Sequence, residues 1–367
     1  MKKKIVVSAN STWNIYNFRL GLLINLKKKF DIIILSPKLD EYSQYLSEYG
    51  FEIVSFKINP RSIGVLDNLF LLYKYWIILK KYKPDFFLPF TIKPNIYGSI
   101  ICRLLNIKII NNITGLGNTF IKNFILEKLV LFLYKIALKK SVIVFFHNKK
   151  DQTLFVKKNI LLKDNCTVIP GSGINLSEYK FQKLKLNKEI FEFTYIGRMI
   201  TDKGILILLD VIKDLSIYKN IRFKLIGSFD KTDKNYLKIY KKIINNNSFN
   251  FEFIPFTNDV KKYIKISDCV ILPSYREGLP RSLLEASALG VPIIASNVPG
   301  CNDLIIDKYN GLLFQKLTVS CLSDKILEFI HLDYESRYKI SKKARSHIEK
   351  NFDEKIVIKR YIDYLDR

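Results

Sequence analysis

The amino-acid sequence predicts an α/β protein of two domains, each with a mainly parallel sheet that carries helices on both faces. Short apolar runs of strand length alternate with longer amphipathic segments along nearly the whole chain. This alternation stops once, at residues 165–179, where Gly, Ser, Asn and Pro are dense, and then starts again. A chain of 367 residues with 48% hydrophobic residues is long enough for two cores of ordinary size.

The first half of the chain carries the elements of one doubly wound domain. Its strands are expected at 2–10, 30–37, 51–58, 84–90, 107–114 and 141–148. Its helices are expected near 17–29, 41–50, 65–82, 95–105 and 123–140.

The second half repeats the pattern and ends in helices. Its strands are expected at 191–199, 221–228, 251–256, 269–274 and 292–297. Its helices are expected near 203–217, 231–247, 259–267, 281–290, 319–331, 334–350 and 353–366. We therefore expect domains at 1–170 and 171–350, with a last helix in 351–367 that packs back towards the N-terminal domain. The two domains are expected to face a central cleft, because such sheets bind ligands beyond the carboxyl ends of their strands.

The chain is strongly basic, with a formal net charge of +26. Residues 1–180 hold 28 Lys and Arg against 11 Asp and Glu, whereas residues 181–367 hold 32 against 23. A composition rich in Lys, Ile and Asn accounts for many lysines but not for this asymmetry. Nucleic acid and an anionic membrane surface are both physical candidates for a partner.

Targeting, membrane-spanning and metal-binding patterns are not evident. The segment MKKKIVVSAN leads directly into a strand-like run, and no apolar stretch of about 18 residues lacks charges. The five cysteines form no CxxC pair and the three histidines are scattered, which disfavours a zinc site. Cys102, Cys269 and Cys321 lie in apolar surroundings and are expected to be buried thiols in a reducing cytoplasm.

The stretch SYREGLPRSLLEASALGVPIIASNVPG, residues 274–300, places two carboxylates around the start of a helix. Pro280 suits the first helical turn, and the amides of Arg281 and Ser282 then point out of the N-terminus, where the helix dipole favours an anion such as phosphate. Glu277 precedes the helix and Glu285 lies more than a turn inside it, about 10 Å away at helical rise. That arrangement fits a nucleotide sugar. The alternative is a solvated loop glutamate and a glutamate on the helix surface.

A second charged corner lies in YIGRMITDKGI, residues 195–205. Arg198 follows a predicted strand and Lys203 precedes a predicted helix. Both side chains can neutralise a diphosphate leaving group. Ordinary surface charge is the alternative, but the flanking Gly197 and Gly204 favour a tight functional corner.

These motifs together resemble a known family. The segments GRM…DKG, EGLPRSLLEA and GVPIIAS are similar to the retaining GT-B glycosyltransferases of family four, the glycosyl transferases group 1. EGLPRSLLE matches that family's E-x7-E motif. The resemblance is strong over 165–350. Over the N-terminal half, NIYNFRLGLL, SPKLDEYSQYL and ITGLGNTF resemble bacterial enzymes of O-antigen, capsule or lipid-linked glycan assembly.

The resemblance implies a role for each matching residue. Glu277, Arg198 and Lys203 would form the catalytic group, with Glu277 by the donor sugar and the two cations on the diphosphate. The other donor-binding residues would be Glu285 at the ribose, Gly278, Leu279, Arg281, Ser282, Gly227 and Phe256, the last near the base. Acceptor-binding residues would be Arg19, Gly115 and Gly117.

Two departures from the family pattern stand out. SANSTWNIYNFR replaces a Gly-Gly turn after the first strand, and the loop ITGLG at 113–117 lacks a histidine that many members direct at the sugar. His147 is the one histidine of this domain, and we interpret it as a structural residue at a strand end.

The implied chemistry needs no cofactor beyond the nucleotide sugar and no metal. The chain has no D-x-D motif, and cationic side chains with a helix dipole can replace a metal ion. The family implies a UDP-linked N-acetylhexosamine donor or a derivative, a polyprenyl-diphosphate-linked saccharide as acceptor, and retention of configuration. Such an enzyme would be cytoplasmic and peripheral on the inner face of the plasma membrane.

Three other classes of protein fit the sequence less well than a glycosyltransferase. The glycine pairs in GLGNTF and GSGINL are not G-x-G-x-x-G loops, which disfavours a dehydrogenase. A UDP-sugar 2-epimerase of the same fold remains an enzymatic alternative. A basic nucleic-acid-binding protein remains a non-enzymatic one, although the aromatic residues lie in strand and helix patterns rather than in lysine-rich loops.

Two helical segments of the N-terminal half suggest contact with a membrane. Residues 65–83 and 123–140 mix apolar, aromatic and basic side chains, as in Tyr73, Trp76 and Lys80. Such helices can lie in a bilayer interface with aromatic residues at headgroup depth. The alternative is that both are core helices with lysines on their solvent-facing sides.

Overall fold

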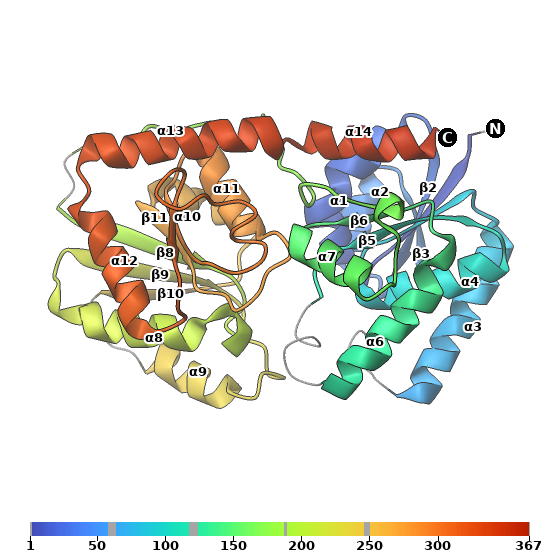
Figure 1. The fold of residues 1–367 in the computed structure, drawn as a ribbon, viewed down its shortest axis with the longest axis horizontal. Coiled ribbons are helices and arrows are strands. Elements are labelled where there is room, and N and C mark those ends of the chain that lie inside the picture. Colours follow the sequence, from blue (N-terminus) through green and yellow to red (C-terminus); the bar gives the residue numbers. More distant parts are fainter. Residues whose placement is uncertain (1, 58–63, 117–123, 187–188, 246–249, 367) are drawn as a thin grey trace. The chain divides into compact units, whose positions relative to one another are not determined.

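The computed structural model describes residues 2–57, 64–116, 124–186, 189–245 and 250–366, and the chain divides into two compact units (Figure 1). The N-terminal unit is Met1–Gly173 with Glu354–Arg367, and the C-terminal unit is Ile174–Asp353. The boundaries predicted from the sequence, 170/171 and 350/351, each lie three residues earlier.

The N-terminal unit is built on a seven-stranded sheet with the order β3-β2-β1-β4-β5-β6-β7. Every neighbouring pair is parallel. The strands are β1 (Lys4–Ser8), β2 (Asp31–Ser36), β3 (Glu52–Ser55), β4 (Phe86–Pro89), β5 (Lys108–Ile113), β6 (Ile143–Phe146) and β7 (Cys166–Val168).

Helices cover this sheet, and the last one comes from the C-terminal end of the chain. They are α1 (Thr12–Lys27), α2 (Glu41–Glu48), α3 (Val65–Tyr82), η1 (Pro94–Gly98), α4 (Ser99–Leu104), α6 (Phe124–Ala137), η2 (Leu138–Lys140), α7 (Lys149–Lys157), η3 (Lys163–Asn165) and α14 (Glu354–Leu365). Helix α14 packs on α1, and its Val357, Tyr361 and Leu365 join the core of this unit.

The C-terminal unit has a six-stranded parallel sheet with the order β10-β9-β8-β11-β12-β13. The strands are β8 (Phe191–Ile196), β9 (Ile221–Gly227), β10 (Phe251–Pro255), β11 (Cys269–Leu272), β12 (Ile293–Ser296) and β13 (Leu312–Phe314). The helices are η4 (Thr201–Lys203), α8 (Ile205–Asp214), η5 (Leu215–Ile217), α9 (Tyr236–Ile244), α10 (Val260–Ile266), α11 (Arg281–Leu289), α12 (Val319–His331) and α13 (Tyr334–Asn351). Two parallel-sheet units confirm the predicted α/β class.

The sequence explains these elements locally. The inner strands are almost continuous apolar runs, as in IVFF of β6 and CVIL of β11, because helices bury both of their faces. Side-chain caps begin several helices: Ser11 accepts from the Asn14 amide before α1, and Asn148 from the Asp151 amide before α7.

The structure also corrects several expectations. The stretch 165–179, expected to be a linker, begins with strand β7, and both β13 and helix α7 were not predicted. The helix expected at 95–105 begins with a π-helical turn, η1, before α4. Cys102 and Cys269 are buried as expected, but Cys321 is only half-buried.

Candidate functional site

The candidate residues of the C-terminal unit gather where parallel strands end. Gly197 follows β8, Gly227 ends β9, Ser274 lies two residues after β11, and Ser296 ends β12. The four strands are neighbours in the order β9-β8-β11-β12, so their carboxyl ends share one edge of the sheet. Ligands of doubly wound sheets bind at this edge.

Two glycines let the backbone segments at this edge approach closely. Gly204 has φ +71°, and a Cβ placed on it would lie 1.8 Å from the carbonyl oxygen of Pro273. Gly227 has φ +152°, and a Cβ there would lie 1.9 Å from the carbonyl oxygen of Gly197. Only glycine fits these positions without a backbone shift. The backbone is therefore tightly packed at Gly204, as predicted, and Gly197 provides the carbonyl that Gly227 approaches.

Lys203 and Glu277 meet at this corner. Lys203, the last residue of η4, places its Nζ 2.5 Å from Oε1 of Glu277. The hydroxyl of Ser274 donates to the same oxygen over 2.6 Å. Both charged side chains are largely buried, and the pairing satisfies charges that would be costly to bury alone. The two residues predicted to serve one donor are thus in direct contact.

The loop that carries Glu277 is supported from behind by the turn at 298–300. The amide of Glu277 donates to the Pro299 carbonyl over 3.1 Å. Gly300 has φ +85°, and a Cβ on it would lie 2.8 Å from Cβ of Glu277 and 2.7 Å from the Gly278 carbonyl oxygen. The Pro-Gly pair that ends the 274–300 stretch therefore supports the backbone of the loop that carries Glu277.

Arg198 is the more accessible cation of the corner. Its side chain is 56% exposed, and its Nη1 lies 3.5 Å from Oδ2 of Asp230. The hydroxyl of Tyr195 donates to the Arg198 carbonyl over 2.8 Å, which anchors the backbone while the guanidinium extends outward. An exposed pair at this distance is weak, so an anionic ligand can compete with Asp230 for the guanidinium.

Helix α11 begins beside the Glu277 loop. Pro280 is its N-cap, one position before the helix rather than in the predicted first turn. The amide of Leu284 makes the first helical bond, to the Pro280 carbonyl. The amides of Ser282 and Leu283 precede this bond, so no carbonyl of the helix accepts from them. The first turn carries no acidic residue, which leaves the positive end of the dipole available to an anion.

Glu285 is not the surface glutamate that the alternative reading assumed. Only 7% of the residue is exposed, and its Oε1 accepts from the Tyr179 hydroxyl over 2.9 Å and from Arg281 Nε over 3.0 Å. Burial acts to lower the pKa of Arg281, but the charges and hydrogen bonds of Glu285 and Tyr179 together outweigh burial, so the pKa of Arg281 is raised. Burial, followed by the Glu285 charge, raises the pKa of Tyr179. Tyr179 is therefore a neutral donor to a fixed carboxylate.

The remaining donor-binding candidates lie around the same edge of the sheet. Leu279 packs against the core of this unit, and Phe256 follows β10 with half of its surface exposed. Three residues of this site, Tyr179, Ser274 and Asp230, were not predicted. A carboxylate and a hydroxyl three positions apart, as in Ser274 and Glu277, are visible in sequence, whereas Tyr179 lies 106 positions from its partner.

The acceptor candidates belong to the N-terminal unit. Arg19 is buried in α1, with its guanidinium carbon 4.4 Å from the ring centroid of Phe90. Gly115 has φ +135°, and Gly117 lies outside the described residues. His147 directly follows β6 and is buried, and burial, followed by the charge of Arg19, holds its pKa well below the usual value.

Two further features of the described residues bear on ligands. Within the described residues no group of three or more His, Cys, Asp or Glu side chains could hold a metal ion.

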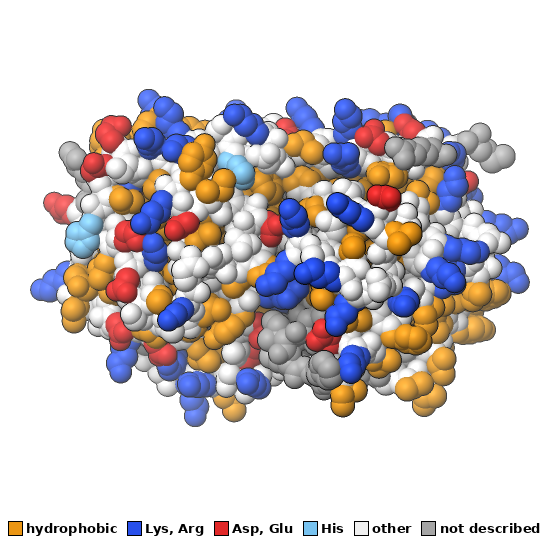
Figure 2. Space-filling view, in the orientation of Figure 1, with side chains coloured by type: hydrophobic (Ala, Val, Ile, Leu, Met, Phe, Trp, Pro, Cys, Tyr) orange, Lys and Arg blue, Asp and Glu red, His pale blue; other side chains and the backbone are white. Residues whose placement is uncertain are grey.

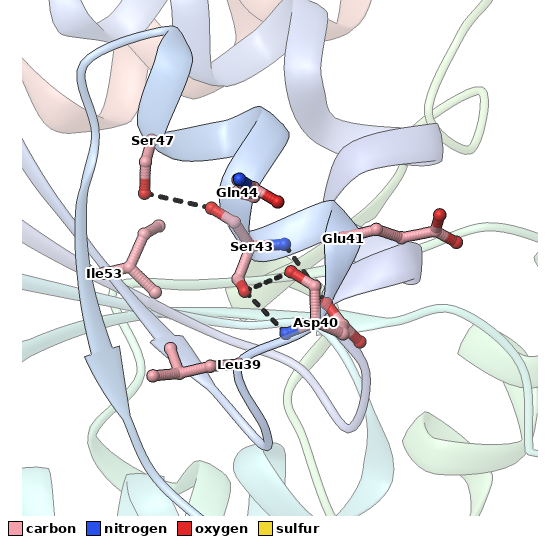
Figure 3. A pocket seen from close by; sticks show the side chains of 7 residues that line it. All are labelled: Leu39, Asp40, Glu41, Ser43, Gln44, Ser47 and Ile53. Atoms are coloured by element: carbon pink, nitrogen blue, oxygen red, sulfur yellow. Dashed lines mark hydrogen bonds between the residues drawn. The ribbon is translucent and has the colours of Figure 1, made fainter.

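A hollow of about 500 Å³ in the N-terminal unit is lined by Leu39, Asp40, Glu41, Ser43, Gln44, Ser47 and Ile53 (Figure 3). Two of its polar residues form the capping box of α2, where Ser43 N donates to Asp40 Oδ1 over 3.1 Å and Asp40 N to Ser43 Oγ over 2.7 Å.

Both units match known protein families. Residues 177–347 match the model described as glycosyl transferases group 1, and residues 4–148 match that described as glycosyl transferase 4-like. These matches cover the strand-edge site and strands β1 to β6 of the N-terminal unit.

Curated relatives match over nearly the full chain. One is the N,N'-diacetylbacillosaminyl-diphospho-undecaprenol alpha-1,3-N-acetylgalactosaminyltransferase of Campylobacter jejuni, at 28% identity over 96% of each chain. Another is the UDP-Gal:alpha-D-GlcNAc-diphosphoundecaprenol alpha-1,3-galactosyltransferase of Escherichia coli, at 25% identity over 91% of this chain and 87% of that protein.

A solved structure has the same fold. Anabaena Alr3699/HepE in complex with UDP and glucose superposes with a TM-score of 0.81 at 18% identity, covering 99% of both chains.

Proposed function

The chain belongs to the glycosyltransferases, with a group 1 region at residues 177–347, and from this membership we propose that it is a retaining, metal-independent hexosyltransferase. Its donor would be a UDP-sugar, with an N-acetylhexosamine or a derivative as the best candidate. Its acceptor would be a polyprenyl-diphosphate-linked saccharide in the assembly of a bacterial surface polysaccharide.

One observation supports the part of this proposal that concerns binding of the nucleotide-sugar donor. Lys203, Glu277 and the N-terminus of α11 meet at the carboxyl edge of one parallel sheet, with Arg198 on the adjoining loop. Two cations and a helix N-terminus suit a diphosphate, and a carboxylate fixed by Ser274 suits sugar hydroxyls. The buried carboxylate of Glu285, oriented by Tyr179, suits the hydroxyls of a ribose.

The proposed reaction exchanges one bond at the anomeric carbon. The bond from that carbon to the diphosphate oxygen breaks, and a bond to the acceptor hydroxyl oxygen forms on the same face. The departing diphosphate oxygen takes the acceptor proton. Arg198, Lys203 and the dipole of α11 would stabilise the negative charge that develops on the leaving group, a role that metal ions fill in other transferases.

The acceptor half of the proposal rests on the relatives. The names of the Campylobacter and Escherichia enzymes describe undecaprenyl-diphosphate-linked acceptors and an alpha linkage. A third relative, at 26% identity over 90% of this chain and 88% of that protein, is the capsular polysaccharide biosynthesis glycosyltransferase CapM of Staphylococcus aureus. An alpha-linked product formed from an alpha-linked donor would mean that the configuration at the anomeric carbon is retained.

A panel assay tests the proposal. The protein is incubated with UDP-GlcNAc, UDP-GalNAc, UDP-galactose or UDP-glucose and a synthetic polyprenyl-diphosphate-linked monosaccharide, and the product is followed by mass and by proton NMR of the anomeric signal. We expect one hexosyl addition with an alpha signal. Conversion of a donor without acceptor would favour the 2-epimerase, and salt-resistant retention of DNA on a filter would favour a nucleic-acid-binding protein.

A further inference from the structure

Helix α3 presents an apolar stripe to the outside of the N-terminal unit. Its buried side, Leu71, Tyr75 and Leu79, joins a core cluster with Phe87 and Ile109. Its outer side carries exposed large hydrophobic residues, of which Leu66 is 82% exposed: Val65, Leu66, Leu69, Phe70, Tyr73, Trp76 and Ile77. Their three- and four-residue spacing forms one continuous stripe. The helix is a core helix on its buried side, as the alternative has it, but its solvent-facing side carries large apolar residues as well as lysines.

Helix α6 repeats this arrangement. Val130, Leu131 and Tyr134 are buried in a core cluster, whereas Ile125, Leu129, Phe132 and Ile136 are exposed at intervals of three and four residues. Helices α3 and α6 both pack on η1 and α4, so they belong to one side of this unit. In Figure 1 both extend to the lower edge of the unit, and in Figure 2 hydrophobic side chains gather there.

Lysines follow the apolar residues along both helices. In α3, Lys80 and Lys81 lie in the last turn and Lys83 just beyond it. After the apolar stripe of α6, Lys139 and Lys140 are exposed in η2. Each helix thus begins apolar and ends basic, and the two acidic residues of the first turns, Asp67 and Glu127, stand against a larger number of lysines.

We propose that the exposed stripes of α3 and α6 with their terminal lysines form a docking surface for a lipid bilayer that contains anionic lipids. Apolar and aromatic side chains would enter the headgroup and upper acyl region, and the lysines would contact anionic headgroups. Among the described residues no helix is long and apolar enough to cross a membrane, so the contact would be peripheral. The choice of a membrane rests on the proposed function, because a polyprenyl-linked acceptor lies in one.

The distribution of charge favours a lipid bilayer over two other binding partners, a second copy of the chain and nucleic acid. A second copy of the chain on a two-fold axis would bring the same lysines against one another, which disfavours association. Nucleic acid would use the lysines but leave the aliphatic stripes of both helices exposed. A bilayer with anionic headgroups uses both the apolar and the basic residues.

Vesicle co-sedimentation tests the surface without donor or acceptor, so its failure is distinguishable from failure of the proposed transfer. We expect binding to vesicles with about a third phosphatidylglycerol, and much weaker binding to pure phosphatidylcholine or at high salt. Lys80→Gln with Lys81→Gln should weaken binding roughly tenfold or more, since each lysine contributes about fivefold. Leu66→Ser with Phe70→Ser should weaken it at least tenfold. The control Ile217→Ser, at a residue 77% exposed in the C-terminal unit, should bind as the wild type does.

Trp76 provides an internal reporter, because the chain has only two tryptophans. In a Trp13→Phe variant the fluorescence of Trp76 should shift to the blue on adding anionic vesicles and be quenched by brominated acyl chains. No vesicle binding at low salt, or binding without a Trp76 response, would overturn the proposal. Self-association that Leu66→Ser abolishes would also overturn it, in favour of a second copy.

Discussion

Lys203 Nζ and Glu277 Oε1 lie 2.5 Å apart, although 74 positions separate these residues in the chain. Gly204 permits the contact because it lets η4 approach Pro273, just before the loop that carries Glu277. Donor binding would add a phosphate oxygen beside the existing partner of Lys203, because the lysine ammonium group has three N–H donors. The ion pair positions both groups before the donor arrives, which is the arrangement that electrostatic stabilisation requires.

Replacing Glu277 by Gln should reduce turnover much more than nucleotide affinity. The amide keeps the size of the side chain but removes the charge that pairs with Lys203 and that would face the donor sugar. We expect kcat to fall at least tenfold while the Kd for UDP changes by less than about threefold, measured by product formation and calorimetry. Glu252→Gln, at an exposed carboxylate on β10, is the matched control. Equal losses in kcat and UDP affinity would mean that Glu277 acts on the nucleotide instead.

Tyr179→Phe should weaken donor binding through Glu285. The substitution removes one of two donors to the Glu285 carboxylate, the other being Arg281. This hydrogen bond already exists without UDP, so its loss affects affinity only by leaving the Glu285 carboxylate less well oriented. We expect the Kd for UDP to rise several-fold. Tyr218→Phe, at an exposed tyrosine, serves as the control. If Tyr179→Phe binds UDP with wild-type affinity, Tyr179 does not position Glu285 for nucleotide binding.

Chelation should leave the transfer reaction intact. The diphosphate charge is assigned to Arg198, Lys203 and the α11 terminus, which need no metal ion. Activity measured with excess EDTA should therefore stay within about twofold of the untreated enzyme. Loss of activity with EDTA and recovery with Mg²⁺ or Mn²⁺ would contradict this assignment.

His147 should make the N-terminal unit less stable in mild acid. Its folded-state pKa lies well below the ordinary value of about 6.5, so both states are neutral at that site above pH 6.5. As the pH falls below 6.5, the unfolded chain binds a proton that the folded unit does not, and the free energy of unfolding falls by up to about 1.4 kcal/mol per pH unit.

His147→Gln should remove this part of the pH dependence. Both tryptophans, Trp13 and Trp76, lie in the N-terminal unit, so urea unfolding followed by their fluorescence reports on that unit. The free energies of unfolding of the wild type and the variant should differ by a constant amount above pH 7.5. This difference should become smaller as the pH falls towards 5. A difference that stays constant throughout this range would show that His147 is not the group that titrates.

The sequence predicted the repeating α/β pattern because strands buried on both faces are apolar without interruption, as in IVFF of β6. Short or polar elements escaped prediction. Strands β7 and β13 have only three residues each. The sequence of α7, KKDQTLFVK, is largely polar, and its main helix signal is the N-cap residue Asn148. Length and periodicity carry too little signal in such segments.

Contacts within the candidate site can be inferred from the sequence where the partners are close in the chain, but not where the fold brings distant residues together. Arg281 and Glu285 are four residues apart on one helix, a spacing that allows an ion pair, but their pairing was not predicted. The Tyr179 contact to Glu285 and the Lys203 contact to Glu277 depend on packing between distant segments. The four charged candidates were predicted to be ligand-binding residues, and in the structure each also contacts another protein side chain. They are Arg198, Lys203, Glu277 and Glu285.

The central claim is that the C-terminal unit binds the diphosphate of a nucleotide sugar through Arg198 and Lys203, and calorimetric titration with UDP tests it most directly. We predict that Arg198→Ala and Lys203→Ala each weaken UDP binding about tenfold or more, because a charged contact to phosphate contributes about 1.5–3 kcal/mol. Lys213→Ala, at an exposed lysine in the last turn of α8, should bind UDP as the wild type does. Wild-type UDP affinity in both corner variants, with both folded by circular dichroism, would contradict the account.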